Sequence, residues 1–79
     1  MTNETQEYTF SVFYETNPEG GYVAYVPALP GCFAEGKDKK ETEENIAEEI
    51  ELHLKDLQKE GENIPKDVES LQGIVMVTV

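Results

Sequence analysis

Two residues of this chain are candidates for a catalytic pair, because Cys32 and His53 are its only cysteine and its only histidine. A thiolate activated by an imidazole is a common enzymatic nucleophile. Such a pair needs a third group that orients the histidine, and the sequence offers no clear candidate for it. One cysteine and one histidine also fall short of the three or four ligands of a zinc site. We therefore predict that Cys32 is a small apolar filler and that His53 packs at the edge of the core or at a subunit contact.

Carboxylates are the other chemically capable groups, since the chain has seventeen Asp and Glu residues. Two-metal phosphoryl transfer needs carboxylates that hold both ions. The expected first and last strands, residues 8–14 and 74–79, contain none. Glu15 and Glu35 flank strand ends, where we interpret them as solvated edge charges. The glutamates of residues 41–51 lack the alternating ligands of a calcium loop. We predict no catalytic residue, no metal site and no cofactor, and a degenerate nuclease is a distant alternative.

The charge balance limits the classes of partner. Seventeen acidic residues against six basic ones give a formal net charge of −11. Because phosphate binding depends on Lys and Arg, this chain is not expected to bind DNA or RNA directly, and a basic protein partner is favoured. The alternative is that the acidic excess serves only solubility.

The size and the termini predict one soluble cytoplasmic domain. A chain of 79 residues has room for a single core, and a core this small is often supplemented by oligomerisation, so we expect a homo-oligomer, either a dimer or a tetramer. A single cysteine excludes an internal disulfide, and residues 1–4 do not resemble a signal peptide. No apolar run is long enough to cross a bilayer. We expect residues 1–7 to be disordered and residues 8–79 to form the domain.

The chemically capable residues have to be positioned by a small sheet. Alternating apolar residues predict a first strand over 8–14, and Asn17–Gly21 is a turn cluster between it and a second strand over 22–26. A third strand is expected over 32–35. Between the second and the third strand, proline followed by glycine predicts a tight structural turn. We expect the glycine of this turn to have a positive φ. The residues of this turn are Leu29, Pro30, Gly31 and Cys32.

A long helix follows the third strand. Asp38 and Glu41 have the spacing of a capping box, which predicts a start near Lys39, and Gly61 is the expected stop. On a helical wheel, one set of mostly apolar residues falls within a band of about 140° that should be buried. The set comprises Thr42, Ile46, Ala47, Ile50, His53, Leu54 and Leu57. Leu52 lies outside this band among acidic residues, where it is either an ordinary exposed leucine or part of an interface.

The segment after the helix predicts a fourth strand over 74–79, because these residues are apolar and mostly β-branched. A strand–helix–strand connection in one sheet is a right-handed crossover, which makes the last strand parallel to the first and the third. The expected fold is α+β, with element order β-β-β-α-β. Its four-stranded mixed sheet has strand order 3-2-1-4 and is covered by one helix on one face. The uncovered face should then be apolar and adhesive.

One stretch gives a family resemblance. The string Tyr25-Val26-Pro27-Ala28-Leu29-Pro30-Gly31-Cys32, then Gly36, then an acidic helix with Glu43, Glu44 and Asn45, resembles the HicB-like antitoxin family. The resemblance extends from about residue 8 to residue 57. It implies a truncated ribonuclease-H-like sheet with one helix. Members of the family commonly carry a DNA-binding domain after the sheet. Since the sequence shows no such domain, we expect a stand-alone form, and whether another chain supplies that domain is left open.

The resemblance implies a non-catalytic module that binds protein. Its expected partner is a small, basic, RNA-cleaving toxin of the HicA type, whose basic surface an acidic helix would mask. From the residues themselves we predict that exposed acids of the helix and one apolar anchor bind this partner. The candidates are Glu44, Glu48, Glu49, Glu51 and Leu52. The alternative is a stand-alone homo-oligomeric module that inhibits no toxin.

Overall fold

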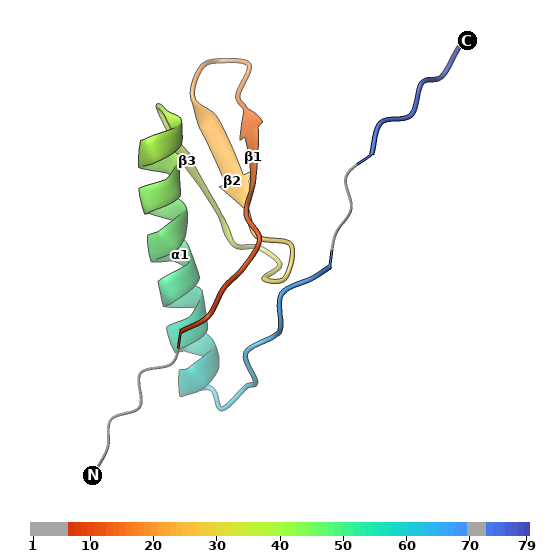
Figure 1. Cartoon of the computed structure of the whole chain (residues 1–79). Coiled ribbons are helices and arrows are strands. Elements are labelled where there is room, and N and C mark those ends of the chain that lie inside the picture. Colours follow the sequence, from red (N-terminus) through yellow and green to blue (C-terminus); the bar gives the residue numbers. More distant parts are fainter. Residues whose placement is uncertain (1–6, 70–72) are drawn as a thin grey trace.

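The structure is a computed structural model that describes residues 7–69 and 73–79. Within them, a three-stranded antiparallel sheet is followed by one long helix. The elements are β1 (Phe13–Thr16), β2 (Tyr22–Tyr25), β3 (Phe33–Gly36) and α1 (Lys39–Lys59). The strand order is β1-β2-β3, and α1 lies across one face of the sheet (Figure 1). The predicted α+β composition and the helix on one face are therefore present.

The predicted four-stranded mixed sheet of order 3-2-1-4 is wrong. The sheet contains β1, β2 and β3 alone, and both of its strand pairs are antiparallel. Residues 73–79 form no strand and extend away from the sheet (Figure 1). The side chains of Ile74, Val75 and Met76 are 96%, 86% and 91% exposed. The parallel fourth strand that the ribonuclease-H-like expectation requires is thus not part of this sheet.

Residues 73–79 have the composition of a strand, but a strand also needs a partner strand to pair with. Propensity describes how well a residue fits a pleated surface, and it does not provide a partner for pairing. The ladder of β1 spans only four residues, so the edge that it offers is short. After α1, the chain contacts the segment before β1 through a side chain: Asp67 Oδ2 accepts hydrogen bonds from the backbone amide and the hydroxyl of Ser11 at 2.9 and 2.7 Å, which is not the backbone ladder of a strand.

The length of β2 sets the bounds of the other strands. Phe13 pairs with Tyr25, and Thr16 pairs with Tyr22. After Val26 the chain turns at Pro27, so the partner of β1 ends there and the ladder cannot extend back to residue 8 as predicted. Phe10, Val12 and Tyr14 alternate along the predicted first strand, and all three pack against the core.

The connection between β2 and β3 consists of two consecutive β-turns. The amide of Leu29 donates to the Val26 carbonyl at 3.0 Å, and the amide of Cys32 donates to the Leu29 carbonyl at 3.0 Å. Gly31 has a φ of 84°, the backbone conformation that a proline–glycine turn of this kind requires. The turns place Leu29 and Cys32 in the core, where they are 1% and 4% exposed.

The helix begins and ends as the sequence predicts. The Asp38 carboxylate accepts a hydrogen bond from the Glu41 amide at 2.8 Å. The Glu41 carboxylate reaches back to the amide of Lys37 at 3.2 Å, one residue earlier than in a standard capping box. At the other end Gly61 has a φ of 73°, and the amide of Glu62 donates to the Leu57 carbonyl at 2.8 Å. This is the 6→1 bond of a Schellman motif.

The helix buries most of the predicted band. Thr42 and Ile46 are 0% and 2% exposed, and Ile50, Leu54 and Leu57 pack partly buried against the same core. His53 is half-buried, whereas Ala47 is exposed. Ala47 lay at the margin of the predicted band, and its small side chain does not reach the sheet. Of the N-terminal segment predicted to be disordered, residues 1–6 lie outside the described residues.

Candidate functional site

The partner-binding residues predicted from the sequence lie on one side of α1. Glu44, Glu48, Glu49 and Glu51 are exposed, and Leu52 is 56% exposed. At 100° per residue, the five positions fall within an arc of about 160° that does not overlap the band around Ile46. Glu44, Glu48 and Leu52 follow one another at four-residue spacing, so they form a single row along the helix. We call these five residues the acidic helix face.

Two members of the acidic helix face have neighbours that distinguish them from the rest. Glu51 Oε1 lies 2.9 Å from Lys55 Nζ, so part of its charge is balanced within the helix. On the helical wheel, Glu49 is the member of this face nearest to the buried band, and its charge adds to the effect of burial in raising the pKa of Cys32. Glu44, Glu48 and Leu52 therefore form the part of the face that points farthest from the sheet.

Cys32 is poorly suited to nucleophilic chemistry. Burial, together with the nearby charge of Glu49, raises the pKa of its thiol. A reactive cysteine needs a lowered pKa and an electropositive setting. The thiol instead lies in the core beside Leu29 and Ile46, which agrees with its predicted role as an apolar filler.

The sheet face opposite α1 carries a row of three aromatic residues that sequence reasoning missed. Phe13 pairs with Tyr25 across the β1–β2 ladder, and Tyr25 pairs with Phe33 across the β2–β3 ladder. The rings of Phe13 and Tyr25 are stacked, with centroids 5.6 Å apart. Tyr25 is 38% exposed and Phe33 is 59% exposed. We call these three residues the aromatic row.

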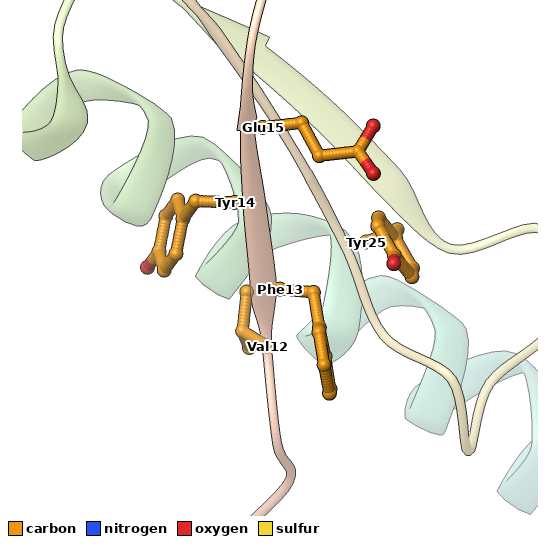
Figure 2. Close-up of a pocket in the computed structure, with 5 residues that line it drawn as sticks. All are labelled: Val12, Phe13, Tyr14, Glu15 and Tyr25. Carbon is orange, nitrogen blue, oxygen red and sulfur yellow. The ribbon is translucent and has the colours of Figure 1, made fainter. Parts of the chain in front are cut away.

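A second row lies one pair along the same face. Glu15 pairs with Val23, and Val23 pairs with Glu35. Figure 2 shows the side chains of Phe13, Glu15 and Tyr25 on one side of β1, and those of Val12 and Tyr14 on the other. An open depression of about 500 Å³ is lined by Val12–Glu15 and Tyr25. Glu15 and Glu35, interpreted above as edge charges, thus flank an apolar surface.

The sequence contained the signal for this face. Alternation places Phe13, Tyr25 and Phe33 on the side opposite to Tyr14 and Ala24, but only the strand register shows that the three rings are neighbours. The turn of residues 17–21 sets that register, since the amide of Asn17 donates to the carbonyl of Gly21 at 2.9 Å.

Tyr14, on the covered face, contacts the first turns of α1. Lys39 Nζ lies 5.3 Å from the centroid of its ring. Burial, and to a lesser extent the charge of Glu43, raises the pKa of the Tyr14 phenol. The chain therefore uses a cation–π contact on the helix side of β1.

Over residues 7–69 and 73–79, no group of three or more His, Cys, Asp and Glu side chains is arranged to hold a metal ion. Within the same residues, α1 is neither apolar enough nor sufficiently free of charge to cross a membrane.

Comparison with known proteins identifies the family. A family profile described as "HicB_like antitoxin of bacterial toxin-antitoxin system" matches residues 10–76. UPF0150 protein Ta0767 of Thermoplasma acidophilum is 47% identical over 58 residues, which cover 73% of this chain and 84% of that protein. UPF0150 protein ssr1765 of Synechocystis sp. is 39% identical over 62 residues, 78% of each chain. A UPF0150 protein of Helicobacter pylori is 52% identical over 40 residues, 51% of this chain and 56% of that protein. This chain therefore belongs to the HicB-like antitoxin family and has an antitoxin-type role in a toxin–antitoxin system.

Proposed function

We propose that this protein neutralises a small, basic, mRNA-cleaving toxin of the HicA type by covering the surface on which the toxin binds RNA. Membership of the family implies a toxin partner in general. The observation that supports the more specific proposal is the acidic helix face, in which four exposed glutamates precede the half-exposed Leu52 on one side of α1. A surface of this sign complements one that binds phosphates.

The mechanism is competition between two polyanions for one basic surface. The glutamates accelerate association at low salt and are screened as the ionic strength rises. Leu52 adds an apolar contact that salt does not screen, and a buried leucine side chain contributes about 1.5 to 3 kcal/mol. The net charge of −11 keeps the antitoxin itself away from RNA.

The same proposal includes the setting of the protein. Residues 8–79 act as a single domain in the cytoplasm, where the mRNA substrate of the toxin is located. Family membership suggests a non-enzymatic module, and the protein acts by binding alone.

Co-expression with the adjacent reading frame tests the proposal. If the neighbouring gene encodes a small basic protein, we expect it to co-purify with this chain and to be released at high salt, because charge pairs hold the complex. The measurement is affinity purification through a tag on this chain, with a salt gradient for elution. Recovery of the chain alone, while the neighbour is expressed and soluble, would contradict the proposal.

A second candidate is a homo-oligomeric module that inhibits no toxin. It is favoured by the exposed apolar residues after α1, of which Val77 is 75% exposed. Solvent-exposed apolar stretches of this kind are usually covered by a partner.

We therefore expect the purified chain to self-associate. Light scattering at micromolar concentration should give at least twice the monomer mass of 8.9 kDa. An oligomer that also binds the neighbouring basic protein would support the first proposal and count against the second. An oligomer that binds nothing would favour the second, and a mass of 8.9 kDa would contradict it.

A further inference from the structure

The aromatic row is unlike the scattered apolar residues of an ordinary surface. Phe13, Tyr25 and Phe33 occupy one register across all three strands, and the first two are stacked. Single exposed apolar residues are common, but three adjacent rings form a continuous platform. Aromatic residues are also the type most enriched at the centre of protein interfaces.

The charges beside the platform indicate what it would bind. Glu15 and Glu35 both pair with Val23, one row along from the rings. Strand spacing places these two positions about 10 Å apart, and the two rows about 7 Å apart. A planar cation lying over Tyr25 is therefore within reach of a carboxylate at the neighbouring row. Arginine combines both properties, because its guanidinium stacks on aromatic faces and pairs with carboxylates.

The chain cannot provide this cation itself. It contains six lysines and no arginine, and β1, β2 and β3 contain neither residue. A second copy docked face to face would place the Glu15 and Glu35 carboxylates of both copies in one contact without a cation from either sheet, and like charges oppose such pairing. The charge of the open face thus favours a basic protein over another copy of this chain.

We propose that the open sheet face receives an arginine-bearing segment of the basic toxin, with the arginine over the aromatic row and its guanidinium directed toward Glu15 or Glu35. This inference rests on the proposed function and adds a second contact surface to the acidic helix face. Since the helix and the open face lie on opposite sides of the sheet (Figure 1), the toxin reaches both only by wrapping around one sheet edge. The sheet has two edges, β1 and β3. The depression lies along β1, so the toxin segment is expected to pass around the β1 edge.

The test is a calorimetric titration of the co-purified basic protein, separated and refolded, with a triple variant of this chain. Tyr25→Thr, Glu15→Gln and Glu35→Gln change exposed residues and introduce side chains that β-strands tolerate. We expect the affinity to fall by about tenfold or more, since one cation–π contact and one charged hydrogen bond together are of that size. The control is Val68→Thr with Glu19→Gln and Glu62→Gln, which removes one exposed apolar side chain and the same number of carboxylates away from the open sheet face and should leave the affinity unchanged.

The outcomes separate this inference from the proposed function. If the wild-type chain binds no basic protein, the proposed function fails, and this inference fails with it. If the triple variant binds like wild type while Glu44→Lys with Glu48→Lys abolishes binding, the function stands and the inference is wrong. If the triple variant changes only the mass of the free chain, the open face is a contact between copies, which also overturns the inference. Melting curves establish that both triple variants are folded.

Discussion

Gly36→Ala is expected to cost the protein much of its stability, because the new methyl group would collide with the backbone of α1. A Cβ at this position lies 2.5 Å from the Thr42 amide nitrogen and 2.6 Å from the Thr42 hydroxyl. Thr42 is fully buried, and its hydroxyl donates to the Asp38 carbonyl at 2.7 Å. The amide nitrogen cannot move unless the helix shifts away from β3, and rotating the hydroxyl away would break its buried hydrogen bond.

The expected size is about 3 kcal/mol, the upper range for overpacking a core. A chain of 79 residues has a total stability of roughly 4 to 12 kcal/mol. Thermal denaturation followed by circular dichroism should show a loss of about 12 °C or more in Tm.

Gly31→Ala is the matched control. Gly31 has a φ of 84°, but a Cβ there meets no atom within 4 Å. The substitution therefore costs only the left-handed backbone, about 1 kcal/mol, and a smaller drop in Tm. If Gly31→Ala destabilised the protein more than Gly36→Ala, the close approach of α1 to β3 would not explain why a glycine is needed at position 36.

Sequence reasoning predicted the parts of the fold that local rules determine. Asp38 and Gly61 carry the cap signals of α1, and the proline–glycine pair defines the turn before Cys32. Each of these features depends on residues within one or two turns of chain. The alternation that predicted the first strand likewise groups Phe10, Val12 and Tyr14, which pack together on the core.

Features that depend on distant pairing were not predicted correctly. The segment 74–79 has the composition of a strand, yet nothing within it specifies a partner, and its residues are exposed. The aromatic row was missed for the same reason, because Phe13 and Phe33 become neighbours of Tyr25 only through the register. The close contact of Gly36 with Thr42 also requires the packed structure. The acidic helix face could be predicted as a set of exposed residues, whereas its part in binding remains a proposal.

Reversing two charges on the acidic helix face is the second change with a large expected effect. Glu44→Lys with Glu48→Lys should weaken binding of the basic toxin on the order of 100-fold, about 2.7 kcal/mol, since two attractive contacts become repulsive. The stability of α1 should change little. Both residues are exposed, and one like-charged pair at four-residue spacing replaces another.

A control with the same net charge separates local contacts from overall attraction. Glu19→Lys with Glu62→Lys raises the net charge by the same amount at exposed positions outside α1. We expect it to slow association modestly at low salt and to leave the affinity at physiological salt nearly unchanged. Equal losses for the two double variants would mean that the total charge, and not the helix face, determines binding.

The measurement that tests the central claim most directly is the rate of RNA cleavage by the purified toxin as this protein is added. Masking of the basic surface predicts that cleavage stops at a stoichiometric amount of the wild-type chain. The inhibition should weaken as salt is raised and be lost with Glu44→Lys and Glu48→Lys. A toxin that binds this protein in a stable complex and still cleaves RNA at its full rate would contradict the account.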